Sequence, residues 1–162
     1  MAGMPNAPEM DIDENTIYRV TITTERGQIV ADLDPRIAPK TVNNFVALAR
    51  QGFYDGLTFH RVEPGFVIQG GCPEGSGRGG PGYRFEDEPV QGNYRQGALA
   101  MANAGPDTNG SQFFVCLEDL TGRLPKQYNL FGHVVSGMDV VAATRRGDVM
   151  QTVTLEELPI ES

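Results

Sequence analysis

Arg61 is the side chain whose chemistry stands out, because its guanidinium keeps its charge at every relevant pH and can donate several hydrogen bonds. It lies in the segment FHRVEPGFVIQGG, residues 59–71, which also carries the amide of Gln69. Two further segments, MANAGPDTNGSQFF at 101–114 and LPKQYNLFG at 124–132, add more amides and several apolar side chains. A fixed cation, neutral hydrogen-bonding groups and an apolar wall can stabilise developing electron density without any covalent step.

Other kinds of site are poorly supported by the sequence. His60, Ser111 and Asp107 are the residue types of a hydrolase triad, but the chain has no G-x-S-x-G elbow, and His60 is better explained as a structural side chain. Residues 75–80 match G-x-G-x-x-G, yet Pro81 follows where a dinucleotide site needs a helix to begin. Two cysteines outside any C-x-x-C arrangement and two histidines make a poor zinc set. We therefore expect no metal ion and no cofactor.

Alternating apolar and polar residues, separated by turn residues, predict a fold that is mainly β. Glu25, Arg26 and Gly27 form the turn of a predicted hairpin. The predicted strands are 17–24, 28–33, 58–62, 66–69, 98–101, 112–115, 130–134 and 149–155.

One helix is predicted clearly, and a second one is short. Pro39 suits a first helical turn, and Val42, Phe45, Val46 and Ala49 follow at helical spacing until Arg50 and Gly52 close the element. The second predicted helix is 138–144. The segment 70–97 holds nine glycines and no sustained period, and a connection of that length inside a compact domain is usually functional.

Length and charge limit the organisation and the partners of the chain. A chain of 162 residues fits one domain, which we expect at 15–162 behind a flexible tail at 1–14. The net charge of −8 repels phosphate backbones and anionic lipids, so neither nucleic acid nor a membrane is an expected partner, whereas long-range steering favours basic clients. Residues 1–14 contain no basic segment followed by an apolar run, so we expect no signal peptide there and predict a cytoplasmic protein with reduced thiols.

The three segments 59–71, 101–114 and 124–132 together closely resemble the cyclophilin family. The resemblance extends from about Ile17 to the C-terminal end. It implies a closed eight-stranded antiparallel β-barrel capped by two α-helices. It also implies a peptidyl-prolyl cis-trans isomerase acting on proline-containing peptides and on unfolded or partly folded proteins. We expect a monomer.

The resemblance carries residue roles with it. It makes Arg61 the catalytic residue, which donates a hydrogen bond to the prolyl nitrogen. Gly75 is expected on the glycine-rich loop that borders the substrate groove. The substrate-binding residues that it implies are Phe66, Val67, Gln69, Gly75, Ala102, Asn103, Ala104, Gln112, Phe114, Leu124 and Tyr128.

Two departures from the family pattern affect these expectations. Many cyclophilins have a tryptophan just before the position of Leu124, but this chain has no tryptophan and carries Arg123 there, so we expect weakened affinity for cyclosporin-type ligands. Tyr128 stands where histidine is common, and its phenol can still pack on a proline ring and donate one hydrogen bond. The alternative function is a proline-segment-binding or chaperone module with little turnover, although the presence of Arg61 favours catalysis.

Overall fold

The computed structural model describes residues 7–160, which contain eight β-strands and two α-helices. In chain order these are β1 Thr16–Thr24, β2 Gly27–Leu33, α1 Pro39–Arg50, β3 Arg61–Glu63, β4 Val67–Gly70, β5 Ala98–Met101, β6 Phe113–Cys116, β7 Leu130–Ser136, α2 Met138–Ala143 and β8 Thr152–Pro159. The prediction of a mainly β fold with two helices is confirmed.

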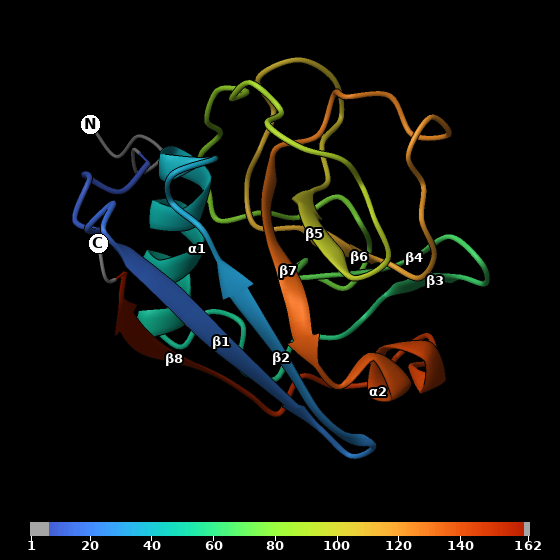
Figure 1. Ribbon diagram of the computed structural model, residues 1–162. Coiled ribbons are helices and arrows are strands. Elements are labelled where there is room, and N and C mark those ends of the chain that lie inside the picture. Colours follow the sequence, from blue (N-terminus) through green and yellow to red (C-terminus); the bar gives the residue numbers. More distant parts are fainter. Residues whose placement is uncertain (1–6, 161–162) are drawn as a thin grey trace.

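All eight strands form one antiparallel sheet in the order β3-β4-β6-β5-β7-β2-β1-β8 (Figure 1). No ladder joins the outer strands β3 and β8 in the described part of the chain. The segments that precede these two strands meet in one isolated bridge, Thr58 with Val149. The prediction of a closed barrel is therefore not confirmed, because β3 has only three residues and pairs with β4 alone.

The β1–β2 hairpin shows why alternation predicted the strands well. Val20 pairs with Ala31 and Ile22 with Ile29, and these four side chains are buried on one face of the sheet. Gly27 closes the turn with φ of +133°, a conformation that L side chains rarely adopt. Every second side chain along these strands thus points into the core, while the side chains between them face the solvent.

Helix α1 buries the predicted apolar stripe and also two asparagines. Val42, Phe45 and Val46 pack into the core, and the helix lies against β8 and β7 (Figure 1). Asn43 and Asn44 are buried as well, because their amides bind other segments of the chain. These polar contacts are long-range, so the helical pattern alone did not predict them.

Asn43 binds the segment that precedes β1. Its Nδ2 donates to the carbonyl oxygens of Pro8 and Glu9, at 3.3 Å and 3.1 Å, and its Oδ1 accepts from the Asp11 N–H at 2.9 Å. Part of the predicted tail at 1–14 thus contacts α1, and its first six residues lie outside the described part of the chain.

An aromatic cluster forms the centre of the core. The ring of Phe113 lies 5.4 Å from that of Phe45, 5.7 Å from that of Tyr54 and 6.4 Å from that of Phe59, all in edge-to-face geometry. All four rings are fully buried.

None of the helices within residues 7–160 has the length and apolar character that crossing a membrane requires.

Candidate functional site

A cavity of about 170 Å³ lies where β3, β4 and β6 meet the loops after β5 and β6. We call it the proline cavity, after the substrate group that the resemblance implies for it. The structure brings together here nine of the twelve residues that the sequence predicted for the site. They are Arg61, Phe66, Val67, Gln69, Ala102, Asn103, Phe114, Leu124 and Tyr128.

Strand register explains how distant segments converge on this cavity. Arg61 on β3 lies opposite Gln69 on β4, which lies opposite Phe114 on β6. These three residues form one row across the sheet. Because side chains alternate between the two faces of a strand, Phe114 faces the cavity and Phe113 faces the aromatic core.

A chain of side-chain hydrogen bonds orients the Arg61 guanidinium. Its Nη1 donates to Gln69 Oε1 at 3.0 Å, and Gln69 Nε2 donates to Gln112 Oε1 at 3.1 Å. Gln112 Nε2 in turn donates to the carbonyl oxygens of Gly77 and Gly79, both at 2.9 Å. The cation is thus connected to the glycine-rich loop through two neutral amides.

Arg61 is held in place but keeps donors for a substrate. Its Nε lies 3.5 Å from Glu63 Oε1, and its side chain remains 45% exposed. A guanidinium has five N–H donors, and these two contacts leave others free to meet a bound peptide. The arrangement therefore presents a fixed positive charge at the rim of the cavity.

The opposite wall is apolar and aromatic. Phe114 is only 5% exposed, and its ring meets that of Tyr128 edge to face at 5.5 Å. Tyr94 fixes the backbone of Tyr128: the Tyr94 hydroxyl donates to the Tyr128 carbonyl at 2.6 Å and accepts from its N–H at 3.1 Å. Burial raises the pKa of Tyr94 to about 12, so this hydroxyl keeps its proton. The sequence analysis missed Tyr94, because it lies 34 residues from the segment that it supports.

The Asn103 side chain is used within the protein. Its Nδ2 donates to the Gln127 carbonyl at 2.9 Å, and its Oδ1 accepts from the Gly105 N–H at 3.1 Å. Among the described residues, the backbone N–H and C=O of Asn103 make no hydrogen bond within the chain. Its backbone is therefore the part best placed to bind a peptide.

A larger cavity of about 510 Å³ adjoins the proline cavity and shares Gln69, Ala102 and Asn103 with it. We call it the glycine-rich cavity. Two predicted site residues, Ala104 and Gln112, line this cavity rather than the first one. Its full lining is Gln69, the segment 77–84, Ala102, Asn103, Ala104, Thr108, Gly110, Ser111 and Gln112.

Gly75 lines neither cavity. Its N–H donates to the Cys72 carbonyl at 3.1 Å, and a methyl group added at Gly75 would point towards Thr58, 3.8 Å away. With φ of +70°, it serves the turn that leads into the loop. Gly75, predicted as a substrate-binding residue on the glycine-rich loop, lies on that loop, but only the loop's later residues, from Gly77 on, line the cavity.

His60 precedes Arg61 and has a buried Nδ1 without a hydrogen-bond partner in the described part of the chain. Burial lowers the pKa of His60, and the positive charges of Arg61 and Arg146 lower it further. The imidazole beside the Arg61 guanidinium is therefore neutral near neutral pH.

Known proteins share both the sequence and the fold of this chain. Residues 19–162 match the protein-family profile described as cyclophilin type peptidyl-prolyl cis-trans isomerase/CLD. Peptidyl-prolyl cis-trans isomerase B of Bacillus subtilis is 52% identical over 132 residues, which cover 80% of this chain and 91% of that protein. This chain belongs to the cyclophilin family.

Solved cyclophilin structures agree with that assignment. A cyclophilin type isomerase of Cryptosporidium parvum superposes with a TM-score of 0.79 at 31% identity, covering 88% of this chain and 99% of that one. The same protein, crystallised in the presence of the dipeptide Ala-Pro, gives a TM-score of 0.72. The predicted resemblance to cyclophilins is confirmed, and with it the enzyme class, peptidyl-prolyl cis-trans isomerase.

The two cysteines of this cyclophilin differ in their surroundings, and we predict different reactivities. Burial opposes ionisation of Cys72, but four backbone N–H groups between residues 74 and 79 favour the thiolate more strongly and lower its pKa. One of them, the Gly79 N–H, lies 3.2 Å from the sulfur. Burial raises the pKa of Cys116 to about 12, and Asp119 adds to that effect.

Both thiols are buried, so iodoacetamide reaches them through local opening of the chain. At about pH 8 it should modify Cys72 before Cys116, because the thiolate is the nucleophile. Mass spectrometry of the digested protein would identify the modified residue, and Cys72→Ser should abolish the fast phase. Equal rates at the two positions would contradict this interpretation of the loop.

Proposed function

We propose that this cyclophilin accelerates rotation about X-Pro bonds by donating a hydrogen bond from Arg61 to the prolyl nitrogen. The observation that carries the proposal is a fixed guanidinium at the rim of a cavity that has an apolar wall. No proton transfer is required, since arginine keeps its charge at any relevant pH. Proline-containing peptides and proline-rich segments of unfolded proteins are the proposed substrates.

The physical obstacle is the partial double bond of the peptide group. Donation of the nitrogen lone pair into the carbonyl leaves a rotational barrier of roughly 18 to 20 kcal/mol. During rotation the nitrogen becomes pyramidal and its lone pair becomes a hydrogen-bond acceptor. A donor aimed at that lone pair stabilises the twisted state more than the planar one, which is the condition for catalysis.

One hydrogen bond is not enough by itself. A preorganised donor contributes about 2.7 to 4 kcal/mol by analogy with oxyanion holes. A millionfold acceleration needs on the order of 8 kcal/mol. We assign the remainder to the apolar wall of Phe114 and Leu124, which disfavours the more polar planar amide, and to flanking peptide groups held by Gln69 and the Asn103 backbone.

The test is a protease-free isomerisation assay. A peptide enriched in the cis X-Pro isomer is diluted into buffer, and its relaxation is followed with the protein at about one hundredth of the peptide concentration. Multiple turnovers should shorten the relaxation in proportion to the amount of protein. Peptide binding without any shortening would leave only the proline-segment-binding function.

The slow, proline-limited refolding phase of an unrelated protein should shorten in the same way when this protein is added.

The pH dependence follows from Arg61 at the rim and from its neighbour His60. A guanidinium keeps its charge at any relevant pH, and His60 protonates only below its ordinary range because its pKa is lowered. We expect kcat/KM to be constant between about pH 7 and about pH 8, and to fall only where protonated His60 adds a second cation beside Arg61. In His60→Gln the fall at low pH should be absent. A bell-shaped profile centred near neutrality in the wild type would indicate acid-base chemistry and contradict the mechanism.

A further inference from the structure

We propose that Arg78 and Arg84 make the glycine-rich cavity a subsite for an acidic side chain of the substrate, close in sequence to its proline. This inference rests on the proposed function and adds a substrate preference to it. It reverses the expectation of basic clients that the net charge alone suggests.

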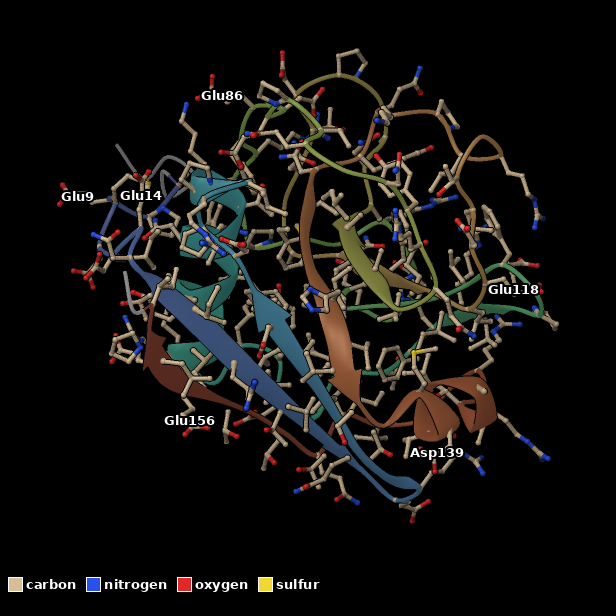
Figure 2. All side chains as sticks on the ribbon, in the orientation of Figure 1. Glu9, Glu14, Glu86, Glu118, Asp139 and Glu156 are labelled. Carbon is tan, nitrogen blue, oxygen red and sulfur yellow. The ribbon has the colours of Figure 1, made fainter. Side chains whose placement is uncertain are left out.

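The charge around the two cavities is opposite to that of the whole protein. The chain has 21 acidic residues against 13 lysines and arginines. The linings of the proline cavity and the glycine-rich cavity nevertheless contain three arginines, Arg61, Arg78 and Arg84, and no acidic residue. Figure 2 shows the labelled acids Glu9, Asp139 and Glu156 on the N-terminal segment, α2 and β8.

Arg78 and Arg84 have no acidic partner within the described residues. The ion pairs there, at 4.0 Å or less, involve Arg19, Arg26, Arg36, Lys40, Arg50 and Arg61. Both Arg78 and Arg84 are exposed. Each guanidinium is therefore free to pair with a charge that a ligand brings.

Acidic residues next to the linings in sequence are engaged elsewhere: Glu86, two residues after Arg84, pairs with Lys40, and Asp87 accepts from Asn109 Nδ2. Glu63 pairs with Arg61, and Glu74 accepts from the Ser76 hydroxyl at 3.3 Å. Asp107, which precedes the lining residue Thr108, accepts from the Asp87 N–H at 2.9 Å. None of these acidic residues belongs to either lining.

Hydrogen bonds from Gln112 hold the backbone on both sides of Arg78. Gln112 binds the carbonyls of Gly77 and Gly79, on either side of Arg78, through the same amide that continues to Gln69 and Arg61. The loop that bears Arg78 is thus connected to the catalytic cation by side-chain hydrogen bonds.

Contacts of Tyr83 with helix α1 and of Phe85 with Asn109 hold the backbone on both sides of Arg84. The hydroxyl of Tyr83 donates to Asn44 Oδ1 on α1, and Phe85 forms an isolated bridge with Asn109. Arg84 lies between these two anchored residues. Two cations on anchored backbone lose less freedom on binding than two on a loose loop.

The two cavities are close enough for one short peptide to occupy both. They share Gln69, Ala102 and Asn103, so their walls are continuous. An extended peptide advances about 3.3 Å per residue. A proline ring in the first cavity therefore places a side chain one to three residues away in the second. At that range local cations outweigh the net charge, because salt screens interactions beyond about 8 Å at physiological ionic strength.

The experiment compares isomerisation of matched peptides that carry Glu, Gln or Lys two residues before proline, and a second set that carries them two residues after it. In at least one set kcat/KM should be about threefold higher for Glu than for Gln, and about tenfold higher than for Lys. The difference should appear in KM rather than kcat. It should shrink near 1 M salt, where the screening length is about 3 Å.

Two variants assign the effect to these arginines. The double variant Arg78→Gln, Arg84→Gln should reduce the Glu-to-Lys ratio to about two or less. Arg95→Gln removes another exposed arginine without an ion pair in the described residues and lines neither cavity, so it should keep the ratio. Equal kcat/KM for the Glu and Lys peptides in both sets would overturn the inference. No acceleration of any peptide would instead reject the proposed function.

Discussion

Arg61→Ala is expected to lower kcat/KM for isomerisation of a short X-Pro peptide by at least about tenfold, and by about 100-fold if the lost hydrogen bond resembles an oxyanion-hole donor. The reason is that this hydrogen bond forms fully only when the prolyl nitrogen is pyramidal. Peptide affinity should fall much less, because the apolar wall that holds the ring remains.

The measurement is a peptide relaxation assay paired with a titration of the same peptide followed by NMR. Arg36→Ala is the matched control, since Arg36 is also an exposed arginine with an acidic partner nearby, Asp34, but lines neither cavity. It should behave like the wild type. Arg61→Lys should recover little activity, because a compact ammonium cannot reproduce the planar fork. Equal rates for Arg61→Ala and the wild type would dismiss the mechanism.

Phe113→Ala is expected to lower the free energy of unfolding by about 3 to 5 kcal/mol. Phe113 is fully buried, and its ring meets those of Phe45, Tyr54 and Phe59. Removing it leaves a cavity that three rings on separate segments cannot easily fill. Wherever the variant unfolds its activity should be lost as well, because Phe114 beside it forms part of the wall of the proline cavity.

Urea denaturation of the wild type and of Phe113→Ala would test this change in the free energy of unfolding. Phe53→Ala is the matched control, because Phe53 is only half-buried and, among the described residues, its ring meets one other ring, that of Tyr54, edge to face. Phe53→Ala should lower the free energy of unfolding clearly less than Phe113→Ala does. A loss below about 1 kcal/mol in Phe113→Ala would show that the aromatic cluster is not the centre of the core.

The strands and helix α1 could be predicted because their signals are local. Alternation in 17–24 and helical spacing from Pro39 to Arg50 each depend on which side chains must avoid water, and both patterns agree with the structure. Closure of the barrel could not be predicted in this way. It depends on whether β3 and β8 meet along their length, which no local pattern encodes.

The site was predictable where its residues lie in continuous segments. Segment 59–71 places Arg61 and Gln69 opposite each other by hairpin register alone. Supporting residues were missed because their contacts are long-range: Asn44 binds the Gly110 carbonyl 66 residues away. Arg78 and Arg84 likewise line the same cavity only because of the path of segment 77–84, which forms neither helix nor strand and gives no periodic signal in the sequence.

The most direct test of the central claim is a crystal structure of this cyclophilin with a bound X-Pro peptide. We predict the proline ring in the proline cavity against Phe114 and Leu124, with an Arg61 nitrogen about 2.7–3.2 Å from the prolyl nitrogen. A guanidinium turned towards Glu63 and solvent, or a proline ring bound outside this cavity, would contradict the account.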